Sequence, residues 1–299
     1  MNKIVSLFLL SLFAVQVSYA QLIELNKTGG HYVFDMTLNE KAVARVLLET
    51  GFNVSIVDST FFFDNIDVFN FELEPSNAKI GVHTGGSRVI LEGNVSLKVN
   101  DSFEYRGKMV ISPDFFAGKD YNAIIPMQQV YNQKDNGSSI LMLDLPNEKM
   151  NFLTREELGA INYRKRYKMT SAHRGMPIIN TDMVFHYGDK KVELPGEYVL
   201  DLGNGSVLFM NMRNEIAKKA IKGSDFVKIH EVKDNNTGAI IAEAICPDKG
   251  YIAGEMFEYP SIGLTEALTS FTELGLIGLK YFKTKIVVFD FVDGYFYVL

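Results

Sequence analysis

The hydrophobic pattern of the chain consists mostly of short runs of β-branched and aromatic residues. Examples are residues 31–34 (HYVF) and 286–289 (IVVF), and turn residues such as Asn39-Glu40, Gly188-Asp189 and Asp293-Gly294 lie between such runs. Apolar runs of this length that are bounded by turn residues are typical of strands. The pattern therefore predicts a mainly β fold.

Helical periodicity is limited to short stretches of the chain. Residues 211–222 form one apolar face, which includes Ile216 and Ile221, ahead of Gly223 as a stop signal. Residues 264–274 show a similar period. We expect both stretches to be short helices that lie on the sheets.

The chain also contains an internal repeat. A shift of 152 residues aligns Glu49-Thr50-Gly51 with Asp201-Leu202-Gly203, Ile56-Val57 with Leu208-Phe209, Gly86 with Gly238, and residues 124–126 with residues 276–278. After a difference of six residues in the loop 133–138, residues 143–145 align with residues 289–291, and residues 150–153 with residues 296–299. A common offset in separate segments indicates a duplicated unit.

The repeat predicts two similar lobes related by a pseudo-two-fold axis, residues 21–160 and residues 161–299. A plainer interpretation is that duplicated β-domains merely keep their glycine turns in matching places, and it stays open. If the axis is present, corresponding loops meet on it, and the carboxylates of Glu49 and Asp201 share one site. Two carboxyl groups at hydrogen-bonding distance share a proton, so one acts as a base and the other as an acid. Such a pair can activate water for attack on a peptide carbonyl.

Composition and charge exclude several other functions. The chain has 299 residues, a net charge of −6 and a pI near 5.5, which argue against nucleic acid as a partner. The basic cluster 164–168 (RKRYK) is interpreted as a solvated connector, with a docking patch as the alternative. The five histidines show no close metal-ligand spacing, so neither a metal nor an organic cofactor is expected. We expect a monomer.

The first 20 residues, MNKIVSLFLLSLFAVQVSYA, have the features of a cleaved secretory signal peptide. No later stretch approaches the roughly 20 apolar residues that a membrane helix requires. We therefore expect a secreted or periplasmic protein with no membrane contact after cleavage. Cys246 is the only cysteine, so an internal disulfide is impossible.

On these residues the sequence resembles the aspartic peptidases of the pepsin and retropepsin type, in the bilobal form of exported bacterial aspartyl proteases. The resemblance rests on ETG at 49–51, DLG at 201–203, LIG at 276–278 followed by LKYF, and the closing hairpin IVVFDFVDGYFYVL. It implies two retropepsin-like β-barrel lobes, a peptide or unfolded protein as substrate, and Glu49 and Asp201 as the catalytic pair. The supporting loop residues would be Thr50, Gly51, Leu202, Gly203 and Asn204, with Asn204 donating to Asp201.

The resemblance also implies a hairpin that closes over the substrate. Residues 79–90 occupy the place of this flap in the first lobe, and residues 234–240 occupy its counterpart in the second. The flap residues expected to face substrate are His83, Thr84, Gly85 and Gly86, together with Gly238 in the second lobe.

Four departures from the family pattern fall on the chemistry. Glu49 replaces an aspartate, and its extra methylene moves the carboxylate by about 1 Å, a misplacement that can cost about 10²-fold in rate. Leu202 replaces a hydroxyl residue, so Thr50 loses its symmetric partner. Phe52 replaces a small residue, and Pro126 replaces a glycine that lets a strand pass behind the loop.

Three functions therefore stay open at this point. The first is an exported aspartic-type endopeptidase, which these departures would make less active. The second is a catalytically impaired pseudo-peptidase that binds extended peptides by strand pairing. The third is an exported β-rich structural or carbohydrate-binding protein.

Overall fold

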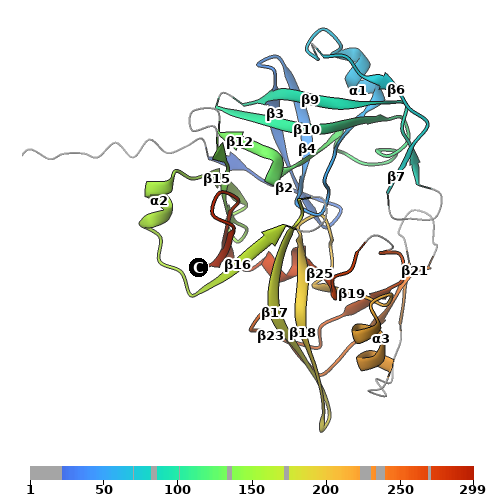
Figure 1. Ribbon diagram of the computed structural model, residues 1–299, viewed down its shortest axis with the longest axis vertical. Helices are drawn as coiled ribbons and strands as arrows, with labels where there is room; N and C mark the ends of the chain where they lie inside the picture. Colours follow the sequence, from blue (N-terminus) through green and yellow to red (C-terminus); the bar gives the residue numbers. More distant parts are fainter. Residues whose placement is uncertain are drawn as a thin grey trace, which may run out of the picture.

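The computed structural model describes residues 22–69, 71–81, 86–100, 102–132, 137–171, 175–222, 230–233, 240–268 and 271–299, which fold mainly into β-strands (Figure 1). The expected signal peptide, residues 1–20, lies outside these ranges. Figure 1 shows two lobes, the first in blue to green and the second in yellow to red. Within the described residues, no helix is both long and apolar enough to cross a membrane.

The first lobe is built on one twisted sheet. Its strand order is β13 (Gly137–Ser138), β12 (Val130–Asn132), β10 (Phe103–Ser112), β5 (Ser55–Asp58), β11 (Ala123–Pro126), β4 (Ala42–Glu49), β3 (His31–Leu38), β9 (Leu91–Val99) and β6 (Glu74–Pro75), with β2 (Asn26–Thr28) paired to β3. The helices α1 (Ser59–Asp64) and η1 (Met127–Gln129) follow β5 and β11. A separate hairpin consists of β7 (Lys79–Ile80) and β8 (Ser87–Arg88).

The second lobe repeats this plan. Its strand order is β16 (Lys165–Ser171), β17 (Pro177–Tyr187), β18 (Lys190–Asp201), β25 (Gly275–Gly278), β19 (Leu208–Asn211), β24 (Ile262–Thr265), β21 (Ile240–Ile245) and β20 (His230–Lys233), with β22 (Lys249–Ile252) and β23 (Glu255–Glu258) branching from β17. The helices are α3 (Glu215–Lys222) and α4 (Leu279–Phe282), and α2 (Arg155–Gly159) precedes the lobe.

A sheet of strands from both halves joins the lobes. Its order is β1 (Ile23–Glu24), β15 (Lys149–Phe152), β14 (Ile140–Asp144), β26 (Ile286–Asp290), β27 (Tyr295–Val298) and β16. Its central pair, β14 and β26, is antiparallel and places Met142 opposite Val288. These two residues are 146 positions apart, which is the offset of the repeat in this region. Equivalent residues can face each other only on the symmetry axis, so the pseudo-two-fold axis passes between them.

The register of the central strands follows the repeat in most of the fold. Leu48 pairs with Ile125 in the first lobe, and Leu200 pairs with Ile277 in the second, an offset of 152 at both positions. The neighbouring strands β5 and β19 are offset by one residue more than the predicted 152. Ile124 faces Ile56 in the first lobe, whereas Leu276 faces Phe209 in the second. The loop after Gly203 is therefore one residue longer than its first-lobe counterpart, and the alignment of Ile56 with Leu208 was wrong.

The side-chain pattern explains why these segments are strands. In β9, Val95, Leu97 and Val99 are buried while Asn94 and Ser96 are exposed, which is the two-residue period of a sheet with one covered face. By contrast, all residues of β11 and β25 are buried, because each strand lies inside its lobe between two neighbours. The apolar run 124–125 and its counterpart 276–277 meet this requirement.

The two helix predictions fared differently. Helix α3 is present but begins at Glu215, because Asn211 is still in β19 and the Asn214 side chain caps the helix by accepting from Ile216 N at 3.0 Å. Ile216 is 64% exposed and so does not belong to the apolar face. The second helix prediction, 264–274, was wrong. This segment starts in β24, where parallel pairing with β19 overrides the helical period.

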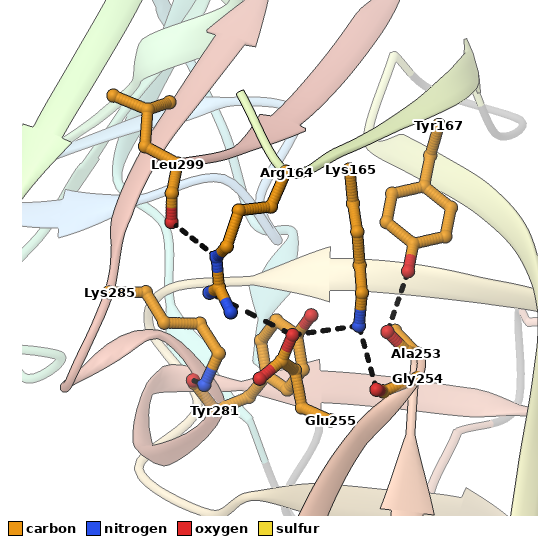
Figure 2. A network of polar contacts seen from close by, with 9 residues as sticks. All are labelled: Arg164, Lys165, Tyr167, Ala253, Gly254, Glu255, Tyr281, Lys285 and Leu299. Atoms are coloured by element: carbon orange, nitrogen blue, oxygen red, sulfur yellow. Dashed lines mark hydrogen bonds and ion pairs between the residues drawn. The ribbon is translucent and has the colours of Figure 1, made fainter. Parts of the chain in front are cut away.

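The basic cluster 164–168 was wrongly interpreted as a connector, because most of it forms β16. Figure 2 shows how its side chains hold the turn between β22 and β23. Lys165 Nζ donates to Glu255 Oε1 and to Gly254 O, both at 2.7 Å, and the Tyr167 hydroxyl donates to Ala253 O at 2.6 Å. Arg164 Nε donates to Leu299 O at 2.9 Å. These contacts dock a second-lobe hairpin on the sheet that joins the lobes.

Candidate active site

Glu49 and Asp201 occupy equivalent places at the ends of two central strands. Glu49 is the last residue of β4 and lies opposite Pro126 of β11, while Asp201 is the last residue of β18 and lies opposite Gly278 of β25. In each lobe the apolar run that precedes the carboxylate is buried between neighbouring strands. Each carboxyl group therefore lies where its strand leaves the core of its lobe and meets the other lobe.

The structure brings these two side chains together. Their carboxyl groups share a hydrogen bond, and each lies against the glycine of the opposite loop. A methyl group on Gly51 would overlap the Asp201 carboxyl group, and one on Gly203 would overlap that of Glu49. Both glycines are therefore required by close approach across the interface. Glu49 is 2% exposed, whereas Asp201 is partly exposed.

Both carboxyl groups have raised pKa values. Burial raises the pKa of Glu49 well above its usual value, and the neighbouring Asp201 charge adds to this rise. Burial also raises the pKa of Asp201 to about 6, although hydrogen bonds from Glu49 and from the amides of Gly203 and Asn204 favour its ionised form. The shared hydrogen bond thus raises the pKa of Glu49 and lowers that of Asp201. The two carboxyl groups titrate as a pair, so in the singly ionised state one of them holds the proton and donates it to the other.

Thr50 connects the two loops. Its hydroxyl donates to Leu200 O at 2.7 Å and accepts from Leu202 N at 3.1 Å, and the side chain is fully buried. The main chain of the second loop thus serves as the partner, so the leucine at 202 does not prevent this contact. The equivalent contact from residue 202 to the first loop would require a hydroxyl group, which Leu202 lacks. Only the contact made by Thr50 is therefore present.

Asn204 contacts Asp201 through its main chain. Asn204 N donates to Asp201 Oδ1 at 3.1 Å, whereas the side-chain oxygen of Asn204 accepts from Ser206 N and Ser206 Oγ. The expected donation from Asn204 to Asp201 is therefore present, and the main-chain amide makes it because the side chain closes the tight turn of its own loop.

Gln128 and Gln129 contact the first loop, and sequence reasoning did not single them out. Gln128 Nε2 donates to Phe52 O at 2.6 Å and to Thr50 O at 3.2 Å, and Gln129 Nε2 donates to Asn53 O at 2.8 Å. The available signal was Pro126, because the ring of a proline in place of glycine keeps the following main-chain amides away from the loop carbonyls, which then need other donors.

Three aromatic side chains of the first lobe lie near the two loops. Burial raises the pKa of Tyr121 to about 12, and the charge of Glu49 adds to this rise, so the phenol lies near the pair. Phe52 is half-buried and makes an edge contact with Phe115, with ring centroids 6.2 Å apart. His31 lies 3.5 Å from the position that a Cβ of Gly205 would occupy.

The flap residues are described only in part. Strands β7 and β8 pair Lys79 with Arg88 and Ile80 with Ser87, so the base of the predicted hairpin is present. Gly86 has φ +56°, a left-handed conformation that favours glycine. His83, Thr84, Gly85 and Gly238 lie outside the described residues. The described part of the chain contains no group of three or more His, Cys, Asp or Glu side chains placed to hold a metal ion.

Together, the strand plan and the two loops define a two-lobed, pepsin-like fold. In comparisons with known proteins, no family model matches the chain. No curated protein matches it either. Among solved structures, the chain is similar to the aspartic proteinase from Irpex lacteus, with a TM-score of 0.50 and 11% identity over 93% of this chain and 96% of that chain. At this identity the likeness shows the fold alone.

Proposed function

We propose that the protein is an aspartic-type endopeptidase in which Glu49 and Asp201 activate water. The ionised Asp201 takes a proton from a water molecule as its oxygen attacks the peptide carbonyl carbon. Glu49, which holds the shared proton, donates it to the carbonyl oxygen as negative charge develops there. Asp201 then passes the proton that it took from water to the leaving nitrogen as the C–N bond breaks, and Glu49 recovers its proton from a hydroxyl of the tetrahedral intermediate. Thr50, Gly51, Leu202, Gly203 and Asn204 hold the two loops in place. The reaction requires neither a metal nor an organic cofactor.

The observation that carries this proposal is the hydrogen-bonded pair on the lobe interface. Two carboxyl groups with raised pKa values, one of them partly exposed, form an acid and a base within one site. A purely structural role would not require both of them to be desolvated, since burial of an unpaired charge is costly. The pair lies between the two lobes, and this position supports the proposal of an extended peptide as the substrate.

The test is hydrolysis of an unfolded protein between pH 4 and pH 8. Wild type should produce peptides, and Asp201→Asn should not, because the variant lacks the base. Asp67→Asn, an exposed carboxylate at a distance from the site, serves as the matched control and should retain full activity. Equal hydrolysis by wild type and Asp201→Asn would contradict the proposal.

A second candidate is a pseudo-peptidase that binds extended peptides without cleaving them. The observation in its favour is the placement of Glu49, which is buried and fills the space against Gly203 where its longer side chain leaves less room for water. In that case a peptide would pair with strand edges such as β7–β8. Saturable peptide binding by wild type, with no product after long incubation, would favour this function.

We also propose that the protein is exported and acts as a monomer. The support is the sequence of residues 1–20 and the single-chain pair of lobes. An N-terminus near Gln21 in protein recovered from an exporting host would support cleavage of a signal peptide. Sedimentation at the mass of two chains would contradict the monomer.

A further inference from the structure

The loops that carry Glu49 and Asp201 each have main-chain carbonyls that accept hydrogen bonds, and the donors differ between the two lobes. In the second lobe the donors are main-chain amides. Leu279 N donates to Asn204 O at 2.6 Å, and Lys280 N donates to Ser206 O at 3.0 Å. These two hydrogen bonds require the backbone at Gly278 to approach the loop closely, because a Cβ on Gly278 would lie 2.6 Å from Asn204 O. A glycine at 278 therefore allows α4 to begin directly against the loop.

In the first lobe Pro126 stands at the position equivalent to Gly278. The proline ring prevents the backbone from approaching the loop as closely as Gly278 does, so the amides that follow residue 126 do not take the place of Leu279 N and Lys280 N. The amide that proline lacks corresponds to Gly278 N, which donates to Val207 O at 3.1 Å in the second lobe. The equivalent carbonyls are nevertheless satisfied by the side chains of Gln128 and Gln129. Phe52 O corresponds to Asn204 O at the offset of 152, and Asn53 O corresponds to Ser206 O once the inserted residue is counted.

The orientation of the Gln128 amide is set by these two donations. Its side chain is 8% exposed, and its Oε1 has no hydrogen-bond partner among the described residues. If the amide were flipped, Oε1 would face the carbonyl oxygens of Thr50 and Phe52, which would repel it. The contacts therefore depend on the NH₂ group, and a side chain without this donor cannot make them.

We propose that Gln128 and Gln129 are positioning residues, whose side-chain amides replace the main-chain donors of the second lobe and hold the Glu49 loop against Asp201. The inference rests on the proposed function only for its effect on turnover, since the placement of Glu49 can be measured without any activity. Thr50 O and Phe52 O flank Gly51, so a shift of these carbonyls moves the Glu49 carboxyl group directly.

Replacement of Gln128 or Gln129 by methionine keeps the side-chain length and removes the donors. Asn151→Leu is the matched control, because Asn151 is another buried amide side chain, 5% exposed, but lies in β15 outside the site. In Gln128→Met we expect kcat for peptide hydrolysis to fall roughly 10- to 100-fold, the effect of a misplacement of about 1 Å, with KM changed less than about twofold. The control should leave both constants unchanged.

The second measurement follows the carbon-13 shift of the Glu49 carboxyl group against pH, assigned by its loss in Glu49→Gln. A displaced loop lets water reach Glu49 and separates it from Asp201, so its pKa should fall toward the usual value in Gln128→Met and not in Asn151→Leu. If wild type hydrolyses nothing and this shift still occurs, the peptidase proposal fails and the positioning role stands. Unchanged Glu49 titration in both methionine variants would overturn the inference. If Gln128→Met does not fold, Gln129→Met, at a half-buried position, decides alone.

Discussion

Removal of the Asp201 carboxylate should make the stability of the protein depend less on pH. The folded-state pKa of Asp201 is about 6, against 3.8 without the fold. A group of this kind binds its proton more tightly in the folded state than in the unfolded state. Its contribution to stability is therefore complete below about pH 3.8 and is lost as the pH rises through about 6.

The size of this loss follows from the pKa difference. A rise from 3.8 to about 6 corresponds to at most about 3 kcal/mol, and contact of the partly exposed side chain with water reduces this value. Glu49 has a raised pKa for the same reason and adds to the loss in the same direction. Against a total stability of about 5–15 kcal/mol, this change is large enough to measure.

The assay is urea unfolding at several pH values between 4 and 8. Because the chain contains no tryptophan, far-ultraviolet circular dichroism is the suitable probe. Wild type should lose stability between pH 4 and pH 7, and Asp201→Asn should lose less, with unchanged m-values. Asp67→Asn should follow wild type. Parallel profiles for wild type and Asp201→Asn would refute the assignment of buried, proton-sharing carboxyl groups.

Three other predictions concern the site. Peptide hydrolysis should be fastest near or above pH 6, because Asp201 must be ionised. An optimum near pH 4 would contradict the raised pKa values. Gly203→Ala should abolish hydrolysis by displacing Glu49, whereas Gly205→Ala meets only ordinary contacts and should retain activity in the same assay. Thr50→Val should lower the free energy of unfolding by about 1–3 kcal/mol, since it leaves the buried Leu202 amide without its acceptor, and Thr50→Ser should restore most of the loss.

Much of the fold was predictable because its signals are local or repeated. The turn at Asn39-Glu40 adopts positive φ at both residues, 45° and 64°, as its composition suggests. The strands at 31–34 and 286–289 follow from β-branched and aromatic runs. The repeat placed Glu49 and Asp201 in equivalent positions, since duplication preserves the register of strand ends. These inferences require no knowledge of distant contacts.

The sequence alone therefore determined the strands, the turns, the duplication and the two acidic loops. Only the tertiary structure decided that residues 262–265 pair as a strand, because neighbouring strands compete with a weak helical period. The roles of Gln128 and Gln129 also emerged only there, since they lie 76 to 78 residues from the carbonyls that they bind. Likewise, the proton shared by Glu49 and Asp201 depends on burial and on proximity between lobes, which are properties of the folded chain and of no local pattern.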